Sequence, residues 1–328
     1  MRICHYAGME DLLQGGIRTS IRHQREALDI ADIPYTTDPA DDHDILHLNM
    51  VGPQSHYHLR RARRSNTPVV YHAHAPFRDF AGSFRCSTYL APFVRWYTKR
   101  LYRQADLLLP VSDSTDRLLR EEGIDVATQV VTNGIDPDRL DGFEQFAERR
   151  ERYDAEQPVV VNLGLVFPRK GIADFVAAGR AFPDTDFIWF GPMNNRLLRA
   201  PAVTRHVRQA PANVRFPGFV EEAREAFGVG DIFFFPSHEE NQPIAVLEAM
   251  HCGLPLVVRD IAAFDWLEHG THCLKAGDTE GLQDQLQRCI EDPGLRERLG
   301  NNAQALAEEH TLDAVADDLQ QAYDTVQD

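Results

Sequence analysis

The hydrophobic residues of this chain form short runs that alternate with longer stretches in which apolar positions recur every three or four residues. Short apolar runs predict buried strands, and the longer periodic stretches predict amphipathic helices. In the first half, strands are expected at residues 2–6, 45–48, 68–72, 107–111 and 129–132, and helices at 17–31, 54–65, 88–104 and 113–122. Because strands and helices alternate, a parallel sheet is expected in this half.

The second half repeats the pattern, so a second parallel sheet is expected. Its strands are predicted at 158–164, 185–190, 213–216, 232–236 and 255–258, with a helix from Ile172 and final helices at 279–291, 294–309 and 312–326. Residues 136–157 are polar, charge-dense and poor in strand character, so we place the interdomain linker there. A chain of 328 residues exceeds one ordinary core. We therefore predict an α/β protein with two domains, 1–150 and 151–311.

The composition is that of a globular protein, with 43% hydrophobic residues and no apolar run long enough to span a bilayer. The opening residues, Met-Arg-Ile-Cys-His-Tyr, enter a predicted strand without the hydrophobic region of a signal peptide. Five cysteines without a C-x-x-C pair suit free thiols in a reducing compartment. We therefore expect a cytoplasmic protein.

Charge is distributed unusually. Only three lysines accompany 31 arginines, and the net charge is −16. Such an acidic, lysine-poor composition favours work in a salt-rich cytoplasm, although general acidity is the plainer explanation. Residues 56–105 nevertheless contain ten cations and one acid.

Two glutamates, Glu240 and Glu248, bracket a predicted turn from strand to helix. The buried run 232–235 ends at Pro236, and Pro243 suits the first turn of the helix that follows. The N-terminus of a helix carries unpaired N–H groups and positive dipole, so it favours an anionic ligand such as a diphosphate. A carboxylate beside it would suit a polyhydroxylated sugar or a ribose. Taken alone, the pair favours the plainer explanation, in which Glu240 is a solvated loop acid and Glu248 an ordinary glutamate in the first turn of a helix.

Three further turns carry candidate chemistry. Gly15-Gly16 open a predicted helix and allow close approach of a ligand to the backbone. Arg169 and Lys170 follow a predicted strand and precede a helix, which suits a phosphate clamp, or two solvated cations. His72 and His74 end another strand, at the edge where parallel sheets bind ligands. No Cys, Asp or Glu accompanies them at metal-ligand spacing, so no metal site is predicted.

Together these motifs resemble the retaining glycosyltransferases of family 4, across nearly the whole chain and in the same order. The resemblance rests on Gly15-Gly16, His72-Ala-His74, Arg169-Lys170-Gly171 and the Glu240-x7-Glu248 pair. It is most marked with the diacylglycerol glucosyltransferase branch, in segments 68–85, 191–220 and 231–260. It implies the GT-B fold, in which two Rossmann-like domains face a central cleft. It also implies that the last helix, 312–328, packs back on the first domain.

The resemblance also assigns roles. His74 would contact the donor sugar, Lys170 would neutralise the donor diphosphate, Glu240 would hold the sugar hydroxyls and Glu248 would bind the ribose. Gly15 and Gly16 would supply backbone near the diphosphate. Two departures stand out: Leu165 replaces a usual arginine, for which Arg169 would substitute, and Pro243 replaces a usual glycine, which leaves Ile244 and Ala245 to supply N–H donors. Because His74 and Glu240 belong to different predicted domains, domain closure is expected.

The basic segment indicates the second partner. Arginines interleaved with aromatic side chains favour contact with an anionic membrane, although a core-facing helix with a solvated cationic face is the alternative. The proposed membrane patch comprises Arg60, Arg61, Arg63, Arg64, Trp96 and Arg100. Nucleic acid is not expected, because no nucleic-acid module is visible and the net charge opposes it.

The sequence therefore predicts a metal-independent enzyme without a cofactor that moves a hexose from a nucleotide diphosphate sugar to a hydroxyl. A membrane lipid of the diacylglycerol or ether type is the expected acceptor, and the enzyme is expected at the inner face of the cell membrane. A polyprenol-linked glycan or a surface polysaccharide is the alternative acceptor. Outside this class, a sugar-nucleotide epimerase and a non-catalytic sugar-nucleotide-binding protein stay open.

Overall fold

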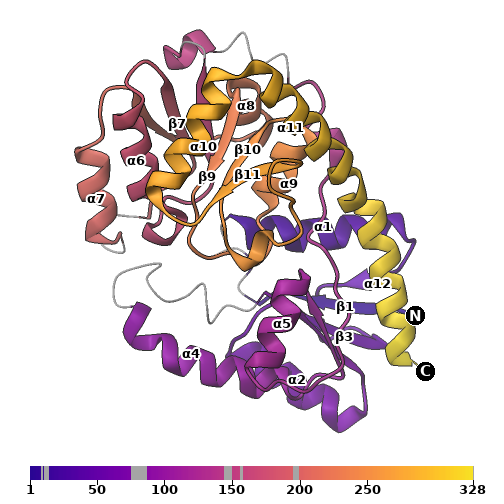
Figure 1. Cartoon of the computed structure of the whole chain (residues 1–328). Helices are drawn as coiled ribbons and strands as arrows, with labels where there is room; N and C mark the ends of the chain where they lie inside the picture. Colours follow the sequence, from indigo (N-terminus) through magenta and orange to yellow (C-terminus); the bar gives the residue numbers. More distant parts are fainter. Residues whose placement is uncertain are drawn as a thin grey trace. The chain divides into compact units, whose positions relative to one another are not determined.

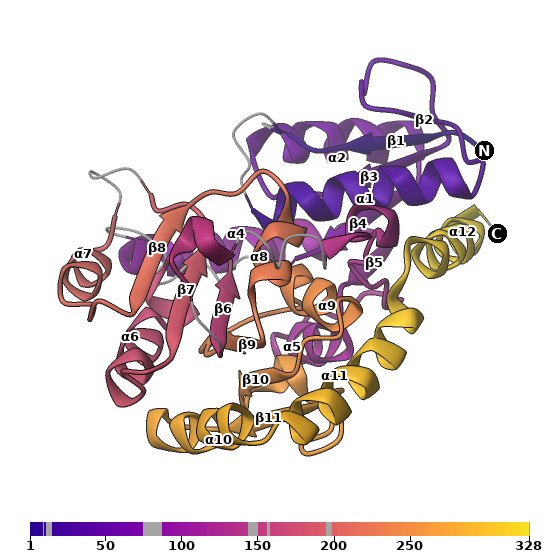
Figure 2. The same cartoon turned by 90° about the horizontal axis from the view of Figure 1, so that it is seen from above.

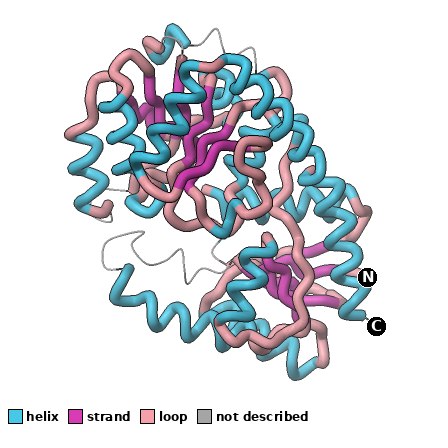
Figure 3. The backbone as a smooth tube through the Cα atoms, in the orientation of Figure 1, coloured by secondary structure: helices cyan, strands magenta, loops and turns pink. Residues whose placement is uncertain are grey.

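The computed structural model describes residues 1–8, 10, 15–74, 87–143, 150–155, 158–194 and 199–327. These residues divide into two compact units. Unit 1 contains residues 1–74, 89–135 and 310–327, and unit 2 contains residues 87–88 and 136–309, among those described. A parallel sheet runs through the middle of each unit (Figure 3).

Unit 1 is built on a five-stranded parallel sheet in the order β2-β1-β3-β4-β5. The strands are β1 (Ile3–Tyr6), β2 (Tyr35–Thr36), β3 (Ile45–Leu48), β4 (Val69–Ala73) and β5 (Leu107–Pro110). The helices are α1 (Gly16–Ile30), α2 (Pro53–Ser65), α4 (Ser87–Tyr102), α5 (Asp113–Glu121) and α12 (Leu312–Gln327).

Successive residues of each strand in unit 1 face opposite layers of helices. Ile3, Ile45 and Val70 pack with residues of α1 and α12, whereas Cys4, Leu46 and Tyr71 pack with residues of α2, α4 and α5. This alternation is the period-two pattern of a strand that is buried on both faces. The C-terminal helix α12 lies beside α1 (Figure 1), so the two ends of the chain share one core.

Unit 2 is built on a six-stranded parallel sheet in the order β11-β10-β9-β6-β7-β8. The strands are β6 (Val159–Leu163), β7 (Asp186–Phe190), β8 (Val214–Gly218), β9 (Ile232–Phe235), β10 (Leu256–Arg259) and β11 (Cys273–Ala276). The helices are α6 (Ile172–Ala181), α7 (Pro201–Arg208), α8 (Ala223–Val229), α9 (Ile244–His251), α10 (Thr279–Glu291) and α11 (Pro293–Ala307). Single 3₁₀ turns occur at η2 (Pro137–Arg139), η4 (Pro168–Lys170), η5 (Ala262–Phe264) and η6 (Glu308–His310).

Aromatic side chains dominate the core of unit 2. Phe175 of α6 makes edge-to-face contacts with Phe187 and Trp189 of β7 and stacks on Phe234 of β9. Helices α6, α7, α10 and α11 contribute to this core, while α8 contacts β6 and α9 contacts β10 and α11 (Figure 2). Within the described residues, no helix is both long enough and apolar enough to cross a bilayer.

Most elements form close to their predicted positions, and the exceptions are short or lie at sheet edges. The strand predicted at 129–132 is wrong: Gln129 and Val131 donate backbone hydrogen bonds to β5, but this segment forms only an isolated bridge at Thr128. Two edge strands, β2 and β11, and two short helices, α7 and α8, were not predicted.

The charge-dense segment before β6 packs on unit 2. The guanidinium of Arg150 lies 2.9 Å from the carboxylate of Asp231, and that of Arg152 lies 2.9 Å from Glu225. The units divide between Ile135 and Asp136. The sequence placed the boundary at residue 150. A run of charged residues resembles a solvated linker in the sequence, because its ion-pair partners lie far away along the chain.

Candidate functional site

Lys170 and Glu240 form an ion pair at the carboxyl ends of two neighbouring strands. Lys170 lies in η4, after β6, and Glu240 lies in the loop after β9; β6 and β9 are paired in the sheet. The ammonium of Lys170 donates a hydrogen bond to Oε1 of Glu240. Their side chains are only 15% and 6% exposed, so water screens this pair less than a surface pair. The carboxyl ends of parallel strands are also where such sheets bind ligands.

Close packing of the two loops brings this pair together. Gly171 has φ +84°, and a Cβ at this position would lie 2.3 Å from the carbonyl oxygen of Pro236. Only glycine combines this backbone conformation with this approach. The backbone N–H of His238 also donates to the carbonyl of Arg169 at 2.8 Å.

Glu240 is held by more than Lys170. The hydroxyl of Ser237 donates to Oε1 of Glu240 at 2.6 Å, the same oxygen that binds Lys170. Lys170 also lies 5.3 Å above the ring of Phe235, within range for a cation–π contact. The carboxylate therefore has a fixed orientation, and Oε2 is the oxygen that neither donor occupies.

Arg169 is anchored to the same loop. Its Nη1 donates to the backbone carbonyl of Glu239 at 3.0 Å and lies 3.9 Å from Oε1 of Glu240. The guanidinium adds positive charge beside the pair and is 15% exposed. Leu165 stands where the family commonly has an arginine. That Arg169 takes over the role of that arginine stays a prediction.

Helix α9 begins beside this pair. Pro243 is its N-cap residue rather than part of its first turn, and Ile244 and Ala245 are its first two residues. The first N–H groups of a helix have no partner within the helix, and among the described residues no side chain caps this one. Ile244 and Ala245 begin the helix, as expected, and their role as N–H donors to the diphosphate stays a prediction. Glu248, in the fifth position of the helix, is partly exposed.

In unit 1, His74 directly follows β4 at the carboxyl end of the sheet. Burial lowers its pKa to about 4, so the imidazole is neutral at pH 7 and can both donate and accept a hydrogen bond. Gly15 is the N-cap residue of α1 with φ +69°, which favours glycine, and Gly16 begins the helix. A Cβ on Gly16 would meet no atom of the described residues within 4 Å.

His74 belongs to a row of histidines that sequence reasoning recognised only in part. His5, His47 and His72 are fully buried on β1, β3 and β4. The ring of His72 stacks on His47 at 5.6 Å between centroids and lies 4.8 Å from that of His74. One sequence pattern could have revealed the row. Three neighbouring strands of the sheet, β1, β3 and β4, each carry a histidine two residues after an aliphatic residue, as in Ile3 and His5.

The row connects to the surrounding helices through polar side chains. His5 pairs with Gln24 of α1 at 2.8 Å, and His47 pairs with the hydroxyl of Tyr323 of α12 at 2.7 Å. Within the described residues, no group of His, Cys, Asp and Glu side chains is arranged to hold a metal ion.

All six residues of the proposed membrane patch are exposed. Arg60, Arg61 and Arg64 on α2 and Arg100 on α4 are exposed, and Trp96 is 57% exposed. Arg63 is also exposed, with 43% of its side chain accessible, and it forms a 2.7 Å ion pair with Asp106 and a hydrogen bond to the carbonyl of Gln104. Its partner precedes β5 and lies more than forty residues away in sequence, so the pair could not be predicted. The membrane role of Arg63 stays a prediction, like that of the rest of the patch.

Helix α4 also exposes further large apolar side chains. Tyr89 is 87% exposed, Leu90 51% and Phe93 61%. The core-facing side of the same helix carries Leu101 and Tyr102, which are buried. The helix thus has both a packed face and an exposed aromatic face.

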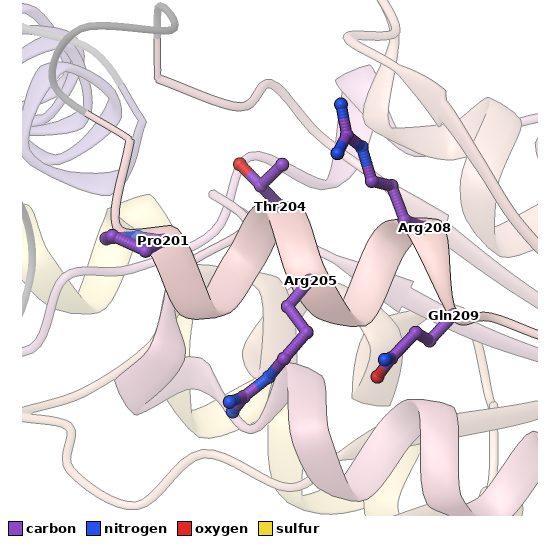
Figure 4. Close-up of a pocket in the computed structure, with 5 residues that line it drawn as sticks. All are labelled: Pro201, Thr204, Arg205, Arg208 and Gln209. Atoms are coloured by element: carbon purple, nitrogen blue, oxygen red, sulfur yellow. The ribbon is translucent and has the colours of Figure 1, made fainter.

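A shallow pocket of about 340 Å³ lies along α7 in unit 2, lined by Pro201, Thr204, Arg205, Arg208 and Gln209. Its two arginines point in different directions (Figure 4). They do not converge on one point, so the pocket lacks the clustered charge of the Lys170 site.

Comparisons with known proteins agree with this geometry. A family model described as glycosyltransferase family 4 matches residues 15–139, and one described as glycosyl transferases group 1 matches residues 157–292. A processive diacylglycerol α-glucosyltransferase of Acholeplasma laidlawii is 32% identical over 99% of this chain and 98% of its own length. An α-galactosylglucosyldiacylglycerol synthase of Streptococcus pneumoniae is 26% identical, covering 82% of this chain and 75% of its own length.

Among solved structures, Anabaena HepE in complex with UDP-glucose superposes with a TM-score of 0.80. It is 18% identical and covers 99% of this chain and 100% of its own. The sucrose-phosphate synthase of Thermosynechococcus elongatus has a TM-score of 0.74 at 19% identity, covering 86% of this chain and 73% of its own. The predicted fold of two parallel-sheet α/β domains, GT-B, is confirmed.

Proposed function

This chain belongs to glycosyltransferase family 4, and we propose that it transfers a hexose from a nucleotide diphosphate sugar to a lipid hydroxyl at a membrane surface. The observation that carries the proposal is the largely buried pair of Lys170 and Glu240, the latter in the loop that leads into α9, whose N-terminus no described side chain caps. Retention of configuration follows from the family alone.

The chemical demand of the reaction is to stabilise the negative charge on the departing diphosphate. Lys170, Arg169 and the first N–H groups of α9 supply positive potential that is in place before the reaction begins. Fixed donors of this kind are effective because they need no reorganisation as charge develops. We therefore propose that departure of the diphosphate needs no metal ion or cofactor. In this scheme Glu240 holds sugar hydroxyls, Glu248 binds the ribose and His74 contacts the sugar as a neutral imidazole.

The donor side is tested by transfer from a panel of nucleotide sugars, beginning with UDP-glucose. We expect Lys170→Ala and Glu240→Ala each to lower turnover at least ~100-fold, as loss of a preorganised charge contact typically does. Lys275→Ala is the matched control, because Lys275 is the other lysine of unit 2 and binds the carbonyl of Phe264 instead. Wild-type rates in both site variants would refute the site.

The acceptor class is supported by two relatives that are described as acting on diacylglycerol lipids. It is also supported by the exposed aromatic face of α4 and the exposed arginines of α2. Aromatic and cationic side chains together favour the interface of an anionic bilayer. We accordingly propose peripheral attachment to the inner face of the cell membrane.

Membrane attachment is tested with vesicles that contain phosphatidylglycerol. Each arginine near an anionic surface contributes about 1 kcal/mol, so changing Arg60, Arg61 and Arg64 to serine should weaken binding up to roughly 100-fold. A triple variant of Arg205, Arg208 and Arg298, exposed arginines of unit 2, removes the same charge elsewhere and should bind normally. Equal weakening in both would show that only net charge matters.

The acceptor assay also separates the alternatives. Transfer to diacylglycerol supports a lipid acceptor, and transfer only to polyprenol-linked sugars replaces it. Conversion of the donor sugar without any acceptor would identify an epimerase, and binding without turnover would identify a non-catalytic protein. We further propose salt adaptation, for which activity should rise between low and molar KCl; a fall would refute it.

A further inference from the structure

A buried charge network lies behind the Lys170–Glu240 pair. Its centre is Asp174, in the first turn of α6, which is 5% exposed. Its Oδ2 lies 2.9 Å from Nε2 of His238, and its Oδ1 lies 2.9 Å from Nη2 of Arg259. The hydroxyl of Thr279, at the start of α10, donates to the same Oδ1. Three elements distant in sequence therefore meet on one carboxylate.

Arg259 extends the network to two backbone carbonyls. Its Nε donates to the carbonyl of Pro236 at 3.2 Å, and its Nη1 donates to that of Gly277 at 2.7 Å. The arginine is the last residue of β10, and its side chain is 7% exposed. With Nη2 in the ion pair with Asp174, the planar guanidinium contacts three oxygen atoms, two of them through hydrogen bonds.

The network fixes the loop that carries Glu240. Pro236, where this loop begins, is held by Arg259, and His238 is held by Asp174. The backbone N–H of His238 in turn binds the carbonyl of Arg169, the residue before Lys170. The loops that carry the two members of the ion pair are therefore tied to each other and to the same buried carboxylate.

Asp174 is charged in this setting. Burial by itself would raise its pKa, but hydrogen bonds from His238 and Thr279 and the charge of Arg259 outweigh burial and lower it. Buried ion pairs are often no more stabilising than apolar residues of the same volume, because desolvation offsets the attraction. Stability alone does not explain a charged cluster at this place, whereas directional control of a loop does.

We propose that Asp174, together with Arg259, is a positioning residue for Glu240. It orients the 236–240 loop so that the carboxylate of Glu240 meets the donor sugar in the geometry that the reaction requires. This inference rests on the proposed function. Displacement of a reacting group by about 1 Å can cost roughly 100-fold in rate, so a fixed loop is directly relevant to turnover.

The first test is Asp174→Asn, which keeps the shape and removes the charge. We expect kcat to fall 10- to 100-fold, with a smaller change in KM for the donor. Asp186→Asn is the matched control, because it breaks the 2.5 Å ion pair with Arg215 in the same unit, away from the loop. A normal kcat for Asp174→Asn, or an equal loss in the control, would overturn the proposal.

The second test asks whether Asp174 acts through Glu240. In a Glu240→Gln background, Asp174→Asn should cause little further loss, since the group that it positions is already altered. Multiplicative losses would show that Asp174 acts elsewhere and would overturn the proposal. If Glu240→Gln alone keeps the wild-type rate, the proposed function fails at this site. That outcome is distinct from failure of the positioning role of Asp174.

The third test separates positioning from folding. Combining Asp174→Asn with Arg259→Met removes the unpaired buried charge, so thermal stability should recover relative to the single variant. The rate should stay low, because the loop has lost its anchors; recovery of both would overturn the proposal.

Amide hydrogen exchange in residues 237–242 gives a readout that does not depend on activity. The exchange rate should increase in Asp174→Asn and stay at the wild-type rate in Asp186→Asn. Unchanged exchange in Asp174→Asn would also overturn the proposal.

Discussion

The buried histidine row makes unit 1 sensitive to mild acid. His5, His47 and His72 are fully buried. Desolvation by burial lowers the pKa of all three, and for His5 it reaches about 4, because an imidazolium ion in this core would lose its hydration. In the unfolded chain a histidine has its ordinary pKa of about 6.5.

The sign and the size of the effect follow from these values. Between pH 6.5 and about 4 the unfolded chain binds a proton at His5 that the folded chain does not bind, so stability falls as the pH falls. The contribution is fully present above pH 6.5 and is lost progressively down to the folded pKa. For His5 alone, the free energy of unfolding should fall by about 2 kcal/mol between pH 7 and pH 5. His47 and His72 act in the same direction.

The assay is urea unfolding at fixed ionic strength, followed by hydrogen exchange in peptides that cover β1, β3 and β4. His5→Gln keeps a polar side chain opposite Gln24 but cannot titrate, so its loss between pH 7 and pH 5 should be smaller than that of the wild type by about 2 kcal/mol. Leu28→Ala, in the same core, is the control: it should lower stability equally at both pH values. A fall as steep in His5→Gln as in the wild type would refute the reasoning.

Three further predictions concern stability and can be checked by calorimetry. Gly171→Ala should destabilise unit 2 by about 1–3 kcal/mol or more, because its Cβ would approach the carbonyl of Pro236 in a left-handed backbone. Gly16→Ala should be neutral, and equal melting temperatures for the two variants would contradict this prediction. Arg63→Ser should cost roughly 1 kcal/mol through loss of the Asp106 pair, and Arg61→Ser should cost nothing. Equal stability of the two variants would show that the pair contributes nothing. Tyr323→Phe should cost about 1–2 kcal/mol, since it removes the hydrogen-bond partner of His47 and keeps the packing. A stability equal to that of the wild type would show that this hydrogen bond contributes nothing.

The sequence determined the architecture of each unit. Buried strands in parallel sheets have continuous apolar runs, such as Ile232–Phe235, and their short length and flanking turn residues distinguish them from helices. Helices with clear periodicity were also placed well, and the helix expected at 279–291 forms over those residues. Elements that depend on their neighbours were missed. The edge strand β11 contains Lys275, and the segment at 129–132 pairs on only one side.

The sequence also determined which residue types are available for chemistry. Lys170 and Glu240 stand out because each follows a buried strand, and strands of one parallel sheet end at the same edge. That rule predicts proximity. It cannot predict that Oε1 of Glu240 receives both Lys170 and Ser237, which depends on side-chain directions that only the packed loops fix.

Tertiary structure alone decided the partners of charged and polar groups. Arg63 and Arg64 are adjacent, exposed and chemically alike, yet Arg63 forms an ion pair with Asp106 that the sequence does not reveal. Asp174 in the sequence is one acid among 50, and only folding brings Arg259 and Thr279 to it. The physical reason is range: backbone preference and hydrophobic periodicity act between near neighbours and are written in local sequence. Ion pairs and hydrogen bonds join residues far apart in the chain, so the fold must exist before they do.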